Sequence, residues 1–123
     1  LAKSKELKLG VASSASTNWV YGNLERLGLI HHFDSINTCD NVIKIKPDPE
    51  LFILTIKQLK IKPLETIIFE DSPNGIKAAK QANAYCVAIP NPITQKLDLS
   101  KADLIMKSFT NHTLDDLLLM FGK

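Results

Sequence analysis

The sequence predicts a single α/β domain built on a parallel sheet with helices on both faces. Short apolar runs alternate with stretches of helical periodicity along the 123 residues, a pattern typical of right-handed β-α-β crossovers. The run at residues 66–69 contains three consecutive apolar residues without polar alternation, as expected for a strand covered on both faces. Because this length suits one hydrophobic core, residues 1–123 are interpreted as one domain.

The individual elements follow from periodicity and from helix-ending signals. Gly28 suits the end of the first helix, and Asp48 and Ser72 can each cap a helix that begins at the following proline. Strands are predicted at residues 7–12, 33–38, 66–69, 85–89 and 102–106, and helices at residues 17–27, 49–59, 73–83 and 113–121. The first three helices are expected to carry one apolar face each, and Trp19 is expected to face either the core or a cap. These faces consist of Trp19, Val20, Leu24 and Leu27, then Phe52, Ile56 and Leu59, then Ile76, Ala79 and Ala82.

Composition excludes several classes of protein. With 15 basic and 13 acidic residues, the net charge of +2 is too small to indicate a nucleic-acid or anionic-membrane partner. Cys39 and Cys86 lack C-x-x-C spacing, so we expect reduced thiols that serve packing. No apolar run approaches the roughly 18 residues of a membrane helix, and no signal-peptide pattern opens the chain. We therefore expect a soluble cytoplasmic protein.

Polar side chains follow or precede the elements that a parallel sheet would bring to one edge. Ser13 follows the first strand, Lys46 precedes the second helix, and Glu70 and Asp71 follow the central apolar run. The carboxyl ends of parallel strands share one edge, where ligands bind. A hydroxyl and an ammonium near a helix start suit a phosphate, and paired carboxylates can hold Mg²⁺. The combination predicts metal-assisted phosphoryl chemistry.

Three segments, taken in order, resemble a known family. They are V-A-S-S at residues 11–14, K-P-D-P-E-L-F at residues 46–52 and F-E-D-S-P-N-G at residues 69–75. They resemble motifs II, III and IV of the haloacid dehalogenase (HAD) superfamily, in its β-phosphoglucomutase-like branch of phosphatases and phosphomutases. The resemblance implies a Rossmann-like core and a reaction on a small phosphorylated metabolite, such as a sugar phosphate, through an aspartyl-phosphate.

The resemblance also implies roles for particular residues. Ser13 would donate a hydrogen bond to the transferring phosphoryl group, and Lys46 would neutralise that group while anchoring the nucleophile. Asp71 would be a direct Mg²⁺ ligand, and Glu70 would orient a metal-bound water. Ser13 and Lys46 would thus be catalytic.

The resemblance also implies two further substrate contacts, and some of the site residues have simpler interpretations. Ser14 would contribute its backbone N–H, and Asn18 would meet the leaving group. Alternatively, Ser13 could be a turn hydroxyl, and the two carboxylates could only stabilise the positive end of the next helix, by about 0.3 to 1 kcal/mol each. The substrate-binding set expected from the resemblance is Ser13, Ser14, Asn18 and Lys46.

One departure from the family pattern is decisive for activity. The family's nucleophile is the first Asp of a D-x-D pair, and no two aspartates of this sequence have that spacing. We therefore expect the C-terminal part of a longer enzyme, a partial core domain that lacks the cap and a central strand between those ending at Ser13 and Asp71. Such a chain would be inactive alone. The alternative is a non-catalytic α/β module that binds phosphate or a partner, with a strand from a second copy filling the gap in a homodimer.

Overall fold

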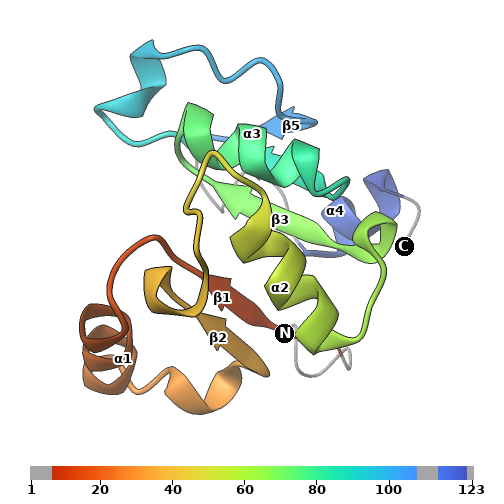
Figure 1. Cartoon of the computed structure of the whole chain (residues 1–123). Coiled ribbons are helices and arrows are strands. Elements are labelled where there is room, and N and C mark those ends of the chain that lie inside the picture. The colour runs from red at the N-terminus through yellow and green to blue at the C-terminus, as the bar shows by residue number, and fades with distance from the viewer. Residues whose placement is uncertain (1–6, 108–113, 122–123) are drawn as a thin grey trace.

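The computed structural model describes residues 7–107 and 114–121 (Figure 1). Within these residues the strands are β1 (Gly10–Ala12), β2 (Ser35–Asn37), β3 (Ile67–Glu70), β4 (Tyr85–Ala88) and β5 (Leu104–Ile105). The helices are α1 (Thr17–Arg26), α2 (Glu50–Leu59), α3 (Pro73–Gln81) and α4 (Leu114–Met120). Short 3-10 turns, η2 (Ile30–His32), η3 (Cys39–Asn41), η4 (Pro63–Glu65) and η5 (Thr94–Lys96), lie in the connections.

The described strands form two separate parallel sheets. In one, β1 pairs with β2, with Val11 opposite Ile36. In the other, the order is β3-β4-β5, with Ile68 opposite Cys86. Among the described residues no strand joins β1 to β3. The predicted parallel α/β fold is confirmed, and the sheet is interrupted between the strands that end at Ala12 and Glu70.

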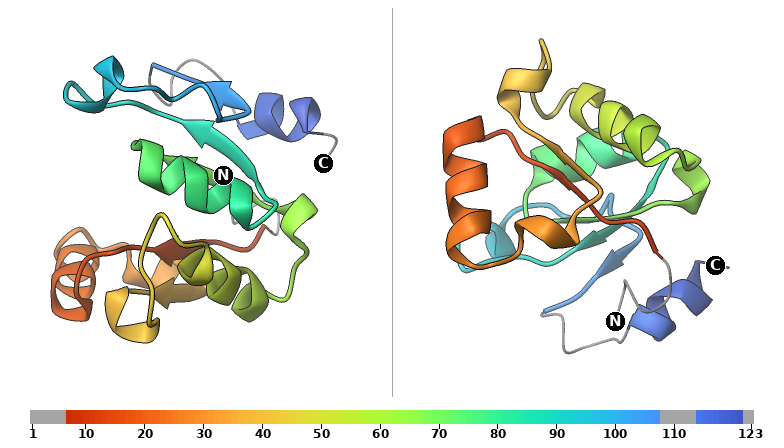
Figure 2. Two further views of the ribbon diagram at one scale, coloured as in Figure 1. Left: turned by 45° about the horizontal axis from the view of Figure 1, so that its top comes forward. Right: turned by 90° about the horizontal axis from the view of Figure 1, so that it is seen from below.

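The larger sheet is buried on both faces. Figure 2 shows α2 and α3 on one side of the strands and α4 on the other. Along β4, Cys86 and Ala88 pack into a cluster with side chains of α2 and α3, whereas Val87 packs with Met106 and with Leu117 of α4. This double coverage explains why β4 is apolar without alternation.

The predicted core faces of α2 and α3 are confirmed, and that of α1 is not. Phe52, Ile56 and Leu59 are buried, as are Ile76, Ala79 and Ala82. In α1 only Val20 is buried, while Trp19 is 62% exposed and Leu27 is 58% exposed. The broad apolar face predicted for α1 is wrong, because this helix lies at the margin of the molecule (Figure 1).

Several predicted strand boundaries are wrong by one to three residues. The strands expected at residues 7–12, 33–38 and 102–106 are shorter than predicted. At Leu9 the carbonyl still accepts from the Asp34 N–H at 2.7 Å, but the Leu9 N–H donates to the Asp34 carboxylate at 2.8 Å instead of to a backbone carbonyl. At the other end of the fold, β3 extends beyond its predicted end to Glu70, while β4 stops at Ala88.

Helix boundaries differ by smaller amounts. α1 and α3 end at Arg26 and Gln81, before the predicted residues 27 and 83. The helix expected to begin at Pro49 begins at Glu50, with Pro49 as its N-cap. The Asp48 carboxylate accepts from the Glu50 N–H at 2.9 Å, so Asp48 satisfies a backbone donor at the helix start, as the sequence predicts. Thr113, where the last helix was expected to begin, lies outside the described residues.

Candidate active site

The carboxyl ends of β1, β3 and β4 open into one cavity of about 420 Å³. Its position is the sheet edge at which open α/β folds bind ligands. The cavity brings together four residues singled out in the sequence, Ser13, Lys46, Glu70 and Asp71, although they lie up to 58 positions apart. It is completed by the apolar side chains of Ala12, Phe69 and Ile89.

Lys46 is held at the centre of this group. Its Nζ donates to the Ala12 carbonyl at 3.0 Å and to Glu70 Oε2 at 2.5 Å, and it lies 4.7 Å from the centroid of the Phe52 ring. The Lys46 and Glu70 side chains are only 14% and 9% exposed. An ammonium has three N–H donors, and acceptors in the described residues take two of them, so one remains for a group in the cavity.

Glu70 packs against the first turn of α3. Its Oε1 accepts from the Asp71 N–H at 3.3 Å, and a Cβ added to Gly75 would collide with its carboxylate. The same turn is capped by Ser72, whose Oγ accepts from the Gly75 N–H at 3.2 Å. Glu70 therefore lies at the positive end of a helix while also pairing with Lys46.

Asp71 is exposed at the mouth of the cavity. Its Oδ2 accepts from the Asn91 amide at 3.1 Å, and its Oδ1 has no hydrogen-bond partner in the described part of the chain. Sequence reasoning missed Asn91. The available signal was its place in a Pro-Asn-Pro segment just after β4, at the same sheet edge as Asp71.

The serine segment after β1 contributes one side chain to the cavity. The Ser13 N–H donates to the Asn37 carbonyl at 3.0 Å, and its Oγ accepts from the Ala15 N–H at 3.1 Å, so its hydroxyl both closes a turn and keeps its own hydrogen to donate. Neither Ser14 nor Asn18 lines the cavity. The Ser14 Oγ is buried without a partner among the described residues, and Asn18 is exposed on α1.

The donor set fits Mg²⁺ as a partial site. Mg²⁺ takes oxygen ligands, commonly one or two carboxylates together with waters and substrate phosphate oxygens. Glu70 and Asp71 offer carboxylate oxygens at the cavity, and Asp71 keeps one oxygen open. Residues 7–107 and 114–121 contain no group of three or more His, Cys, Asp or Glu side chains that could hold a metal.

Cys86, which lies under the site in β4, is not a candidate nucleophile. Burial raises the pKa of its thiol to about 12, and the negative charges of Glu70 and Asp103 contribute to the increase. Because the thiolate is the reactive form of cysteine, the thiol is inert near neutral pH. This agrees with the packing role expected from the sequence.

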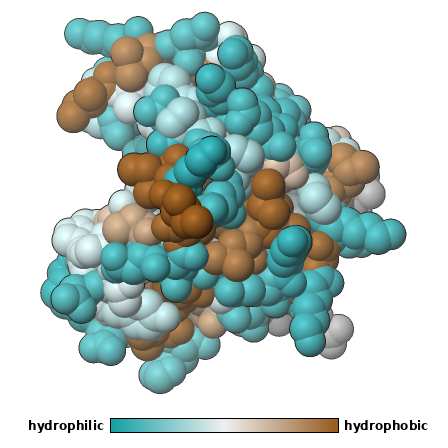
Figure 3. All heavy atoms as spheres, in the orientation of Figure 1, coloured by the Kyte–Doolittle hydropathy of each residue, from teal (hydrophilic) through white to brown (hydrophobic). Residues whose placement is uncertain are grey.

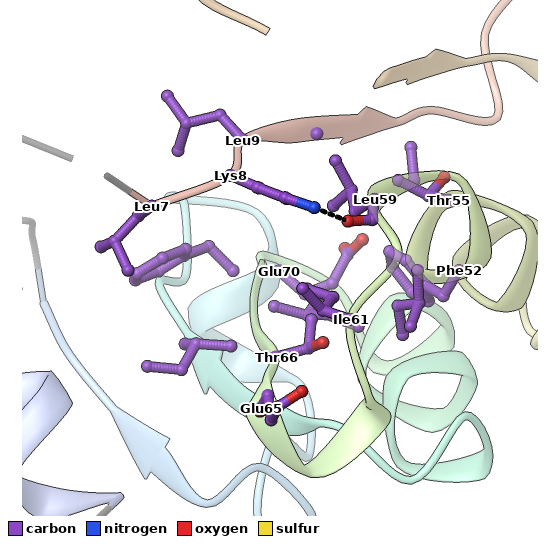
Figure 4. A pocket seen from close by; sticks show the side chains of 16 residues that line it. Leu7, Lys8, Leu9, Phe52, Thr55, Leu59, Ile61, Glu65, Thr66 and Glu70 are labelled. Atoms are coloured by element: carbon purple, nitrogen blue, oxygen red, sulfur yellow. Dashed lines mark hydrogen bonds between the residues drawn. The ribbon is translucent and has the colours of Figure 1, made fainter. Parts of the chain in front are cut away.

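A second hollow of about 330 Å³ separates β1 from β3. Figure 4 shows Leu7, Lys8 and Leu9 along one wall, with Thr66 and Glu70 on the opposite wall. Lys8 Nζ donates to the Leu59 carbonyl at 2.7 Å within it. We call this hollow the interstrand groove; its lining is mostly apolar and includes Leu9, Phe52, Ile56, Ile61 and Ile68.

The interstrand groove is continuous with the candidate active site. Ala12, Phe69 and Glu70 line both hollows. Phe69 is 40% exposed although the sequence predicts a strand covered on both faces, because its strand borders the groove. Figure 3 shows apolar side chains at the surface in the middle of the molecule, over α2 and the loop that precedes it.

Comparison with known proteins identifies the family. The family of haloacid dehalogenase-like hydrolases matches residues 1–89, and the chain belongs to it. The chain is 43% identical over 117 residues to YhcW of Bacillus subtilis, and the matched region covers 95% of this chain and 53% of YhcW. It is 40% identical over 80 residues to the phosphorylated carbohydrates phosphatase of Thermotoga maritima, covering 65% of this chain and 37% of the relative.

A solved structure gives the same result. The β-phosphoglucomutase of Clostridium difficile superposes with a TM-score of 0.84 at 30% identity, over 98% of this chain and 52% of that one. The resemblance deduced from the three motifs is therefore confirmed. The chain spans about half the length of YhcW and of the mutase. No helix in the described parts of the chain is long and apolar enough to cross a membrane.

Proposed function

We propose that this chain supplies the phosphate-binding and magnesium-binding part of a phosphatase or phosphomutase that acts on a small phosphorylated metabolite, with a sugar phosphate as the expected class. The observation that carries the proposal is the convergence of Ser13, Lys46 and Asp71 on one cavity at the carboxyl edge of the strands. The names of the relatives, a phosphatase of phosphorylated carbohydrates and a β-phosphoglucomutase, support the substrate class.

In this proposal Ser13 and Lys46 hold the phosphoryl group. The Ser13 hydroxyl hydrogen and the remaining Lys46 N–H are the donors available beside the cavity. Phosphoryl transfer depends mainly on positioning and on neutralising charge at the phosphoryl oxygens. The carbonyl of Ala12 and the carboxylate of Glu70 fix the position of the Lys46 ammonium. The Lys46 side chain therefore does not have to become ordered when the phosphoryl group binds.

Asp71 would be a direct Mg²⁺ ligand through its open Oδ1, and Glu70 would be its outer partner. Bound Mg²⁺ would neutralise charge on the phosphoryl oxygens. Glu70 is already engaged by Lys46 and by the Asp71 N–H, which suits a residue that orients a water better than one that binds the ion directly.

The covalent step requires an aspartate that this sequence does not offer in a D-x-D pair. β1 and β3 each belong to a parallel pair and border the interstrand groove. An extended strand that lay in the interstrand groove, parallel to β1 and to β3, would end at the candidate active site. This geometry supports an aspartyl-phosphate mechanism in which the nucleophile lies on such a strand, and we expect the 123-residue chain alone to show no turnover.

A fusion protein tests the proposal. This chain would replace the matching part of the C. difficile β-phosphoglucomutase, and Mg²⁺-dependent conversion of hexose phosphates would be measured. We expect activity in the fusion, and a loss of about 100-fold or more in Lys46→Ala and Asp71→Ala, because each removes a charge that stabilises the transition state. Lys44→Ala, which changes an exposed lysine nearby, is the control. Unchanged activity in both site variants would refute the assignment.

A second candidate function follows from the interstrand groove itself. Among the described residues, β1 and β3 have no strand partner on the sides that border it, and unpaired strand edges recruit strands from other chains. The chain could therefore be a non-catalytic module that pairs as a strand-swapped homodimer. Size-exclusion chromatography with light scattering distinguishes the two, since a stable monomer would count against the dimer.

A further inference from the structure

Asn91 occupies a conformationally restricted position beside the site. It follows β4 and lies between Pro90 and Pro92. Proline fixes its own φ angle, and it confines the residue before it to extended conformations. The backbone at Asn91 therefore has few alternatives, so its side chain leaves the chain in a defined direction.

Hydrogen bonds within the loop then fix the orientation of the Asn91 amide. Its Oδ1 accepts from the N–H groups of Ile93 at 2.9 Å and Thr94 at 2.8 Å. Its backbone N–H donates to Thr94 Oγ1 at 3.0 Å. Because the amide oxygen is committed to two backbone donors, the NH₂ group must face the other way. It donates to Asp71 Oδ2 at 3.1 Å.

The two carboxylates of the site are thus held by different kinds of donor. Glu70 receives the Lys46 ammonium, which compensates its charge. Asp71 receives a neutral amide, which fixes one oxygen and leaves the negative charge and the second oxygen available. A hydrogen bond from a neutral donor is what a carboxylate needs if it is to be oriented while still attracting a divalent cation.

We propose that Asn91 is a positioning residue that holds the Asp71 carboxylate in the orientation required to bind Mg²⁺. The inference rests on the magnesium role proposed above for Asp71, and it assigns the loop after β4 to the metal site. Partners of metal ligands typically account for about 10- to 100-fold in metal affinity. Asn91 acts through Asp71 and is not expected to touch the metal.

The test is a titration of the 123-residue chain with Mg²⁺, monitored by NMR at the backbone amides of residues 70–72, 74 and 75, which flank Pro73. We expect the unsubstituted chain to show saturable shifts, and Asn91→Ala to bind about 10- to 100-fold more weakly. Gln95→Ala is the matched control, because Gln95 is an exposed amide of the same loop. Among the described residues its side chain donates only to the Pro92 carbonyl, at 3.4 Å. It should bind as the unsubstituted chain does.

Two further variants separate positioning from loop stability. Asn91→Ser keeps a hydroxyl that can accept from the loop N–H groups but is too short to reach Asp71, so it should bind as weakly as Asn91→Ala. Thr94→Val removes the Thr94 Oγ1 hydrogen bond but keeps the Asn91 amide, so it should bind more tightly than Asn91→Ala.

The outcomes distinguish this inference from the proposed function. The absence of Mg²⁺-dependent shifts in the unsubstituted chain would overturn the magnesium role of Asp71, and this inference with it. Normal affinity in Asn91→Ala or Asn91→Ser would overturn the positioning role alone. Equal weakening by Thr94→Val and Asn91→Ala would also overturn it, because the loop and not the amide would then be responsible.

Discussion

At the scale of single residues, the Glu70 carboxylate can occupy its position because Gly75 has no Cβ. This carboxylate is fixed by Lys46 and by the Asp71 N–H, and it occupies the space that a Cβ at residue 75 would fill. Gly75 therefore has a steric reason to be glycine inside a helix, where glycine is otherwise unfavourable. The ion pair and the first turn of α3 depend on each other.

Gly75→Ala should lower the free energy of unfolding, by about 1 to 3 kcal/mol as in other overpacked sites. The new methyl group would displace Glu70 and break its contact with Lys46. Urea denaturation of the chain measures the change. Gly22→Ala is the matched control, since Gly22 lies in α1 with open space around it and alanine is favoured there by roughly 0.5 to 1 kcal/mol. Equal effects of the two substitutions would contradict the steric explanation.

Asp40 gives a pH-dependent prediction. Its Oδ2 accepts from the Thr17 N–H at 2.9 Å, at the start of α1, where backbone N–H groups lack helical partners. Hydrogen bonds from Thr17 lower the pKa of Asp40 below its ordinary value of 3.8. The stability due to the ionised carboxylate is thus fully present above pH 3.8, and is lost as the pH falls through the lowered pKa.

Asp40→Ala should therefore be less stable than the unsubstituted chain at pH 6, and the difference should shrink as the pH is lowered below 3.8. Unfolding midpoints in urea at a series of pH values provide the measurement. A difference that stays constant down to pH 2 would show that the ionised carboxylate contributes nothing through this hydrogen bond.

At the scale of elements, β4 is the best-covered strand of the described fold. It pairs with β3 and β5, and its residues Cys86, Val87 and Ala88 are completely buried. The strand thereby fixes the sheet edge from which the Asn91 loop departs. The position of the Asn91 loop follows from the packing of β4.

Cys86 reports on the integrity of this strand. At pH 8 we expect a thiol reagent to label Cys39, which is partly exposed, and to label Cys86 only in denaturant. Burial and the raised pKa of about 12 keep Cys86 protonated and inaccessible. Mass spectrometry of the labelled peptides shows which of the two cysteines is labelled first. Rapid native labelling of Cys86 would mean that β4 opens readily.

At the scale of the whole molecule, the two sheets are joined by helices and not by a ladder. α2 packs against β1 and β2, and its Phe52 and Ile56 share a core cluster with Ile76 of α3. Gly10 allows the close approach of β1 to this helix, because an added Cβ would lie 2.8 Å from Thr55 Cγ2. The interstrand groove is left where a continuous sheet would have a strand.

Native-state hydrogen exchange should reveal this division. We expect amides of β4, which has strand partners on both sides, to exchange more slowly than those of β1, which pairs with β2 alone in the described residues and borders the groove. NMR at neutral pH measures both sets. Equal protection would indicate that the two sheets open as one cooperative unit.

The sequence predicts best those features of the fold that depend on residues close to one another in the chain. The order of elements and the buried faces of α2 and α3 were predictable because periodicity and capping are properties of neighbouring residues. The meeting of Ser13, Lys46 and Asp71 was predictable because parallel strands align their carboxyl ends. The exposure of Trp19 was not, because periodicity does not indicate which helix lies at the margin of the fold.

The sequence by itself therefore determined the parallel α/β class, the family and the sheet edge at which the site forms. Only the tertiary structure decided that Lys46 pairs with Glu70, that Gly75 makes room for that carboxylate, and that Asn91 holds Asp71. These contacts join residues from different elements at distances of a few ångströms. Their geometry is set by how the strands and helices pack, and no local pattern encodes it.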